Sequence, residues 1–120
     1  MHIIVQNMGD DDVLASHRQE LRRGTVVLAC LLILRTPDYG YALLKTLDAA
    51  GIPSDANTIY PLLRRLEERG QLESEWNTED SRPRKFYRTS PSGVELATQL
   101  MSDVSALAAS LRTLHEGDDR

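Results

Sequence analysis

The chain has 120 residues, of which 27% are charged and 41% hydrophobic, as is typical of one soluble domain with a single core. Its formal net charge of −4 argues against a nucleic-acid partner, and its single cysteine, Cys30, excludes a disulfide within the chain. The longest apolar run, residues 26–34, is too short to cross a membrane. With no export signal at the N-terminus, these features predict a cytoplasmic protein.

The charges are unevenly distributed along the chain. Residues 1–12 carry a net −3, as do residues 91–120, whereas residues 13–90 hold 12 basic and 10 acidic side chains. The basic residues of this middle region gather in two segments, 64–69 and 82–88. Any anion-binding surface is therefore expected there, although a solvated surface of mixed charge fits the composition equally well.

The segments between residues 1 and 50 differ in the pattern of their apolar residues. Residues 1–16 show no helical periodicity and predict an N-terminal arm. A first helix is predicted over about 17–35, apolar on every side between 26 and 34, which indicates a central position in the core. Pro37 ends this helix, and a second helix is expected over about 38–50.

A third helix is predicted between residues 55 and 70, with Ser54 or Asp55 as its N-terminal cap. Pro61 removes one backbone hydrogen bond, so an irregular first turn or a later start is expected. One side of this helix is apolar and the other is polar. The apolar residues are Ile59, Leu62, Leu63 and Leu66, and the polar ones are Asn57, Thr58, Tyr60, Arg64 and Arg65.

Two alternating runs, 72–76 and 84–89, predict a β-hairpin with a polar, exposed and mobile loop. Trp76, the one tryptophan, is expected to pack the hairpin onto the body of the domain, with stacking on an effector as the alternative. The basic residues Arg82, Arg84 and Lys85 lie in the loop or at the start of the second strand.

The last helix is predicted over 91–115, with Ser90 as its cap and proline at its first position. Its apolar residues alternate by three and four, the spacing of a coiled-coil seam. The other helices are too short to cover it along its whole length, so we expect a seam shared by two subunits; packing within one domain is the alternative. The predicted interface residues are Leu100, Val104, Leu107, Leu111 and Leu114.

Three helices followed by a hairpin are the order of a winged helix-turn-helix, whose third helix enters the DNA major groove while the hairpin, the wing, contacts the backbone. Over about residues 20–95 the sequence resembles the PadR-like transcriptional regulators. The resemblance rests on four segments in matching order: LRRGT at 21–25, YGY at 39–41, NTIYPLLRRLE at 57–67 and RPRKFY at 82–87. Asn57 departs from the family, which usually has glycine there.

The predicted elements give a mainly α fold with a small β-hairpin. It consists of a winged helix-turn-helix over 17–90 and a C-terminal dimerisation helix over 91–115, between the arm at 1–16 and an acidic tail at 116–120. The resemblance implies a homodimer, held by the first and last helices, that binds a palindromic operator as a repressor. A small apolar or aromatic effector between the subunits would release it.

The predicted DNA contacts lie on two elements with different roles. Residues of the third helix are expected to reach base edges, whereas wing residues are expected to hold phosphates. The alternative is an adaptor that uses the same fold to bind protein without sequence-specific DNA binding, since the middle region carries only +2. The predicted contacts are Asn57, Thr58, Tyr60, Arg64, Arg65, Arg82, Arg84 and Lys85.

Enzyme chemistry has little support in the sequence. The three histidines are scattered, and no pair of residues has the spacing of metal ligands. There is no glycine-rich phosphate loop and no nucleophile elbow. Cys30 lies within the apolar run and is expected to behave as a small hydrophobic residue. We therefore expect no catalytic residue, no metal and no cofactor.

Overall fold

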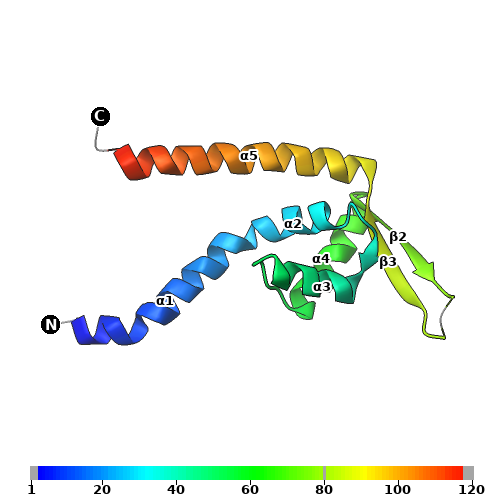
Figure 1. Ribbon diagram of the computed structural model, residues 1–120, viewed down its shortest axis with the longest axis horizontal. Coiled ribbons are helices and arrows are strands. Elements are labelled where there is room, and N and C mark those ends of the chain that lie inside the picture. The colour runs from blue at the N-terminus through cyan, green and yellow to red at the C-terminus, as the bar shows by residue number, and fades with distance from the viewer. Residues whose placement is uncertain (1–2, 80, 118–120) are drawn as a thin grey trace.

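The computed structural model describes residues 3–79 and 81–117 (Figure 1). Helices and a small sheet form one body, from which the first and last helices project toward the same side. The fold is mainly helical, as predicted. In chain order the elements are α1 (Ile3–Arg23), α2 (Thr25–Ile33), β1 (Asp38–Tyr39), α3 (Gly40–Ala49), α4 (Ala56–Glu68), β2 (Leu72–Asn77), β3 (Arg84–Thr89) and α5 (Pro91–Glu116).

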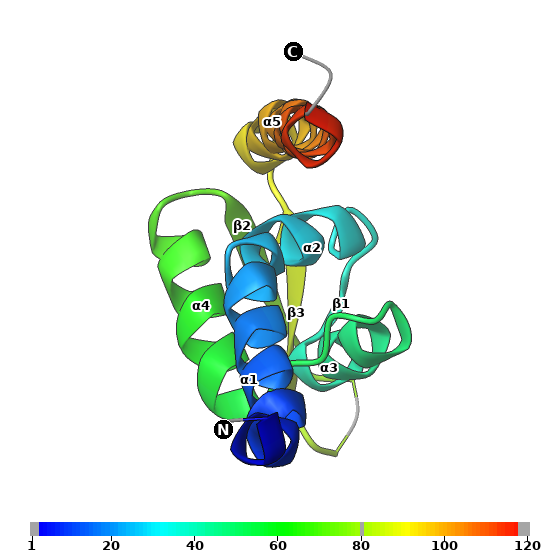
Figure 2. The same cartoon turned by 90° about the vertical axis from the view of Figure 1, so that its left-hand side faces the viewer.

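The core lies where α2, α3 and α4 meet the base of the hairpin and the first turns of α5. Figure 2 shows α2 between α5 on one side and the pair α3 and α4 on the other. This central position explains why α2 is apolar all round, and it confirms the prediction for residues 26–34. Each leucine or isoleucine buried here contributes about 1.5–3 kcal/mol. The largest fully buried side chains are Cys30, Leu31, Leu34, Leu43, Leu47, Ile59, Leu63 and Leu72.

The predicted start of the first helix is wrong. Regular helix begins at residue 3, within the segment expected to be an arm, and Gly24 then separates α1 from α2. The Thr25 hydroxyl donates to the carbonyl of Arg22 across this break (2.7 Å). Residues 10–16 are all exposed, so α1 buries no face there and its sequence carries no apolar period.

Asp55, one of the two predicted N-terminal caps, caps α4. The Asp55 carboxylate accepts the Thr58 N–H (2.9 Å), and the helix then continues past Pro61 to Glu68. The expected irregular first turn is therefore absent. The carbonyl that Pro61 leaves without a helical partner belongs to Asn57, an exposed residue of α4, where solvent can hydrogen-bond to it.

The predicted hairpin is confirmed, and a third strand joins it. The antiparallel sheet has the order β1-β3-β2, with Tyr39 opposite Phe86 and their rings stacked at a centroid distance of 4.0 Å. The amide of Asn77 donates to the Tyr39 hydroxyl (3.0 Å). The sequence pattern assigned both residues of β1, 38 and 39, to a helix, because a two-residue strand is too short to show alternation.

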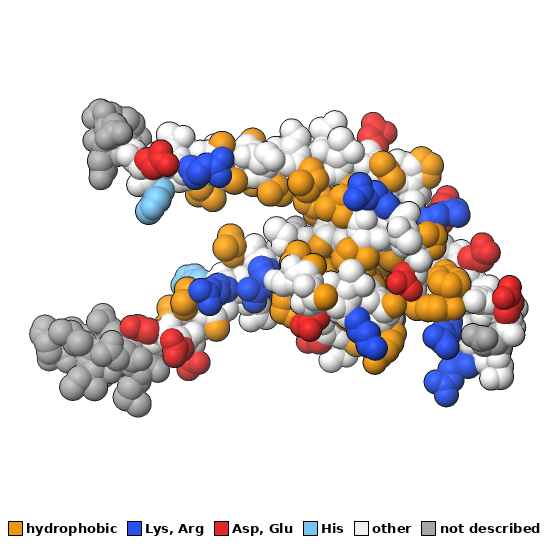
Figure 3. All heavy atoms as spheres, in the orientation of Figure 1, with side chains coloured by type: hydrophobic (Ala, Val, Ile, Leu, Met, Phe, Trp, Pro, Cys, Tyr) orange, Lys and Arg blue, Asp and Glu red, His pale blue; other side chains and the backbone are white. Residues whose placement is uncertain are grey.

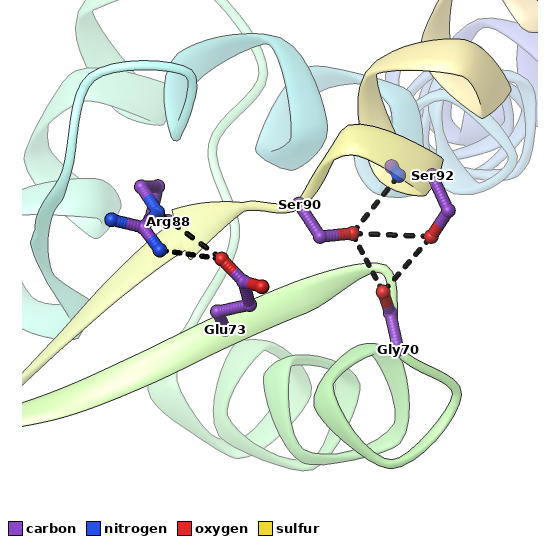
Figure 4. A network of polar contacts seen from close by, with 6 residues as sticks. Gly70, Glu73, Arg88, Ser90 and Ser92 are labelled. Atoms are coloured by element: carbon purple, nitrogen blue, oxygen red, sulfur yellow. Dashed lines mark hydrogen bonds and ion pairs between the residues drawn. The ribbon is translucent and has the colours of Figure 1, made fainter.

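A compact junction joins α4, the wing and α5 (Figure 4). Ser90 accepts the Gly93 N–H (3.1 Å) and so caps α5, as predicted, while its hydroxyl donates to the Gly70 carbonyl (2.6 Å). Ser92 donates to the same carbonyl (3.0 Å). On the other side, the Thr89 hydroxyl donates to the carbonyl of Leu31 (2.7 Å). The base of the wing is therefore fixed to three helices.

α5 leaves the body after its first turns. Within α5, Gly93 and Ala97 are buried. Leu96 and Leu100 are partly buried and pack against the edge of the core. Beyond Leu100 its large apolar side chains are exposed. Of the predicted acidic tail, residues 118–120 lie outside the described part of the chain.

Candidate nucleic-acid interface

All five predicted contact residues on α4 are exposed, but they lie on three strips of the helix. Helical spacing places Asn57 and Arg64 opposite the buried residues, at the outermost line of α4. Tyr60 lies on the side toward α3, and Thr58 and Arg65 lie on the side toward α1 and α2. Together, these five residues form one polar surface on α4, with Asn57 and Arg64 at its centre.

The position of Tyr60 depends on a glycine in α3. Gly40 is buried, and a Cβ atom placed there would lie 2.6 Å from Cε1 of Tyr60 and 3.1 Å from its hydroxyl oxygen. The ring therefore lies against the α3 backbone while 38% of the residue stays exposed. Only glycine allows this approach, which gives the middle residue of the Tyr39-Gly40-Tyr41 segment a physical role.

The wing residues differ from one another in their surroundings. Arg82 and Arg84 are exposed, and the Arg84 guanidinium lies 4.9 Å from the centroid of the Tyr39 ring. Lys85 is half-buried, and its Nζ donates to Oε1 of Glu67 on α4 (3.0 Å). The pairing of Lys85 with Glu67 was not predicted from the sequence, because it depends on how the hairpin packs against α4.

Trp76 does not pack the wing onto the body, so that prediction is wrong. The residue is 61% exposed and lies opposite Lys85 in the sheet register. It shares a face with the buried Leu72, as alternation predicts, but lies four residues further along the strand, about 13 Å at 3.3 Å per residue. At that distance the strand has extended past the core.

A groove of about 590 Å³ separates α4 from the junction of α1 and α2. Arg22, Arg23 and Arg65 border it, together with the side chains of Asp55 and Thr58. Arg23 also pairs with Glu20 (3.2 Å), and both side chains are well exposed. Arg22 and Arg23 were not among the basic surface residues predicted from the sequence, although both belong to the LRRGT segment.

The electrostatics of the site centre on Glu67. The hydrogen bond from Ser74, together with the hydrogen bond and charge of Lys85, holds the pKa of Glu67 below its ordinary value, although partial burial opposes this. Elsewhere, desolvation raises the pKa of Cys30 to about 12. Because Cys30 is also fully buried, it behaves as the predicted hydrophobic core residue.

Within residues 3–79 and 81–117, histidine, cysteine and carboxylate side chains form no group that can hold a metal ion. No helix in the same ranges is both long enough and apolar enough to span a membrane.

The three-helix core, the exposed polar face of α4 and the basic wing define a winged helix-turn-helix of the DNA-binding class. The model of the transcriptional regulator PadR-like family matches residues 27–99. This chain therefore belongs to the PadR-like family of transcriptional regulators.

Solved structures of similar proteins agree with this assignment. A PadR family transcriptional regulator from Eggerthella lenta is 47% identical, with a TM-score of 0.87 over 91% of this chain and 97% of that one. A PadR-like transcription factor from Bacteroides fragilis is 25% identical, with a TM-score of 0.68 over 86% and 98%. A PadR-like regulator from Bacillus cereus shares the fold at 22% identity, with a TM-score of 0.74 over 82% and 99%. A comparison with the curated proteins gave no match.

Proposed function

We propose that this protein is a transcriptional repressor that binds a palindromic operator as a homodimer. The observation that carries the proposal is the exposure of arginines on both elements that a winged helix presents to DNA. Arg64 and Arg65 are exposed on α4, and Arg82 and Arg84 are exposed on the wing. A local basic surface of this kind can hold phosphates although the whole chain is acidic.

The two elements have different roles in this proposal. Asn57 and Arg64 lie on the outermost line of α4, and the exposed part of Tyr60 lies beside them on the side toward α3; side chains there can enter the major groove and reach base edges. Arg82 and Arg84 lie at the outer end of the wing, which reaches the neighbouring phosphate backbone. The helix therefore supplies sequence discrimination, and the wing supplies affinity that does not depend on sequence.

The proposed homodimer rests on α5 and α1. Figure 3 shows hydrophobic side chains along the edge of α5 that faces the projecting α1, with open space between the two helices. A helix that extends from its domain with one apolar side exposed has little stability alone. A second copy would cover this side. The exposed large apolar residues are Val94, Met101, Val104, Leu107, Leu111 and Leu114 on α5 and Val13, Leu14 and Leu21 on α1.

Leu100 differs from the rest of the proposed α5 seam, because it packs partly against the core of its own subunit. It therefore lies at the border between the domain core and the proposed dimer interface.

The effector also remains a proposal: a small apolar or aromatic molecule between the subunits, which would change DNA binding by favouring one arrangement of the two wings. Operator affinity, measured with and without each of a panel of phenolic and planar aromatic compounds, tests for such an effector.

The function is tested by gel shift with the DNA upstream of the protein's own gene, followed by footprinting of the bound site. The proposal predicts a protected site with two-fold symmetry and an affinity well above that for scrambled DNA. Equal weak binding to both DNAs would favour the adaptor, a winged helix that binds protein. The net charge of −4 is the observation that favours that alternative.

A further inference from the structure

One carboxylate on α4 binds both strands of the wing. Glu67 lies in the last turns of α4, and its Oε2 accepts a hydrogen bond from the Ser74 hydroxyl on β2. Its other oxygen, Oε1, accepts from Nζ of Lys85 on β3 at 3.0 Å. Each oxygen thus has its own donor, and each donor comes from a different strand.

These contacts lie along the stretch where the wing leaves the core, because Tyr87, opposite Ser74 in the register, is still buried. Leu72 at the start of β2 is buried, whereas Trp76 near its outer end is exposed. Ser74 lies between them, and Lys85 stands opposite Trp76 in the register. On the opposite face, stacking of Tyr39 on Phe86 joins β3 to β1. The wing is therefore held from both faces, and Glu67 supplies the contact with α4.

We propose that Glu67 is a positioning residue that sets the wing relative to α4, and that Lys85 serves this contact instead of a DNA phosphate. The inference rests on the proposed function, since it concerns how the two DNA-binding elements, α4 and the wing, are held in a fixed relative position. It changes the role predicted for Lys85 from sequence, while Arg82 and Arg84 keep theirs.

The electrostatics favour this role over a phosphate contact. If Lys85 turned to a phosphate, the carboxylate of Glu67 would stay partly buried without its cation and close to the negative backbone of DNA. The Lys85 and Glu67 side chains are 31% and 32% exposed, so solvent screens their attraction less than that of the exposed wing arginines. Glu67 is ionised at neutral pH, and its lowered pKa keeps it ionised in more acidic solution than an ordinary glutamate.

Trp76 allows a test without DNA, because this one tryptophan lies opposite Lys85 on the wing. Time-resolved fluorescence anisotropy of Trp76 should show faster local motion in Glu67→Gln and in Lys85→Gln. The double variant should show no further change, since both substitutions break the same contact between Glu67 and Lys85. The matched control is Glu73→Gln, which removes an ion pair with Arg88 within the hairpin (2.6 Å) and should leave the anisotropy unchanged.

The second measurement is the salt dependence of operator binding. We expect Lys85→Gln to lower affinity several-fold with an unchanged slope of log K against log salt, and Glu67→Gln to do the same. The exchanged pair Glu67→Lys with Lys85→Glu should recover most of the affinity. Arg82→Gln, in contrast, should reduce the slope by about one unit.

A slope reduced by about one unit in Lys85→Gln, with Glu67→Gln binding as well as the wild type, would overturn the inference and make Lys85 a phosphate contact. Unchanged Trp76 anisotropy in both single variants would also overturn it. A wild type that binds no operator DNA contradicts the proposed function instead, and the anisotropy measurement then still decides the role of Glu67.

Discussion

The ring of Tyr60 lies so close to the backbone at Gly40 that a methyl group has no room there. Gly40→Ala should therefore displace Tyr60 from the polar surface of α4 and lower operator affinity, on the order of 1 kcal/mol for one base or phosphate contact. Affinity is measured by titration of labelled operator DNA. The control is Gly24→Ala, where an added Cβ meets nothing within 4 Å. Equal operator binding by both variants would show that the position of Tyr60 does not matter.

The lowered pKa of Glu67 makes a prediction about stability and pH. A carboxyl group whose pKa is lower in the folded state stabilises the fold above its unfolded pKa, here the ordinary value of 4.5. That contribution is lost as the pH falls through the folded value. The wild type should therefore be more stable than Glu67→Gln at pH 7, and this difference should shrink below about pH 4.5. Urea unfolding at several pH values measures it; a difference independent of pH would contradict the account.

At the scale of elements, the junction before α5 determines how the wing and the last helix are held. Ser90→Ala removes the cap of α5 and the hydrogen bond to Gly70, and it should cost about 1–2 kcal/mol. Ser92→Ala removes a weaker contact with the same carbonyl at an exposed site and should cost less. Urea unfolding of both variants compares the two. A smaller loss in Ser90→Ala than in Ser92→Ala would contradict the assigned cap.

The elements that bury one apolar side were the ones that sequence predicted well. α4, the hairpin and α5 each show a regular apolar period, and their caps at Asp55 and Ser90 occupy the expected positions. Residues 10–16 of α1 are all exposed, so their sequence pattern carried no signal. Trp76 shows the other limit: alternation predicted its face, but how far the wing extends beyond the core depends on the packed fold.

The candidate site was predictable to the level of elements and residue types. Exposed polar residues of α4 and arginines of the wing follow from spacing and charge. The pairing of Glu67 with Lys85 does not, because it depends on the register of β2 with β3 and on the angle between hairpin and helix. Gly40 likewise has its role only through a residue twenty positions away.

At the scale of the whole molecule, the projecting α5 predicts a dimer. Val104→Asp would place an unpaired charge in the proposed seam, at a cost of several kcal/mol, and should dissociate the protein into monomers. Ser102→Asp adds the same charge on the other side of α5 and should leave the dimer intact. Sedimentation velocity at micromolar concentration distinguishes these states. A monomeric wild type would contradict the proposed assembly.

If α4 reads the DNA sequence, substitutions on it must change the ratio of affinities for operator and scrambled DNA. We expect at least one of Asn57→Ala, Tyr60→Ala and Arg64→Ala to lose about 1–3 kcal/mol on the operator and little on scrambled DNA. Arg84→Ala should weaken binding to both DNAs about equally and lower the salt slope. If all three α4 variants bind both DNAs as the wild type does, α4 is not the reading surface.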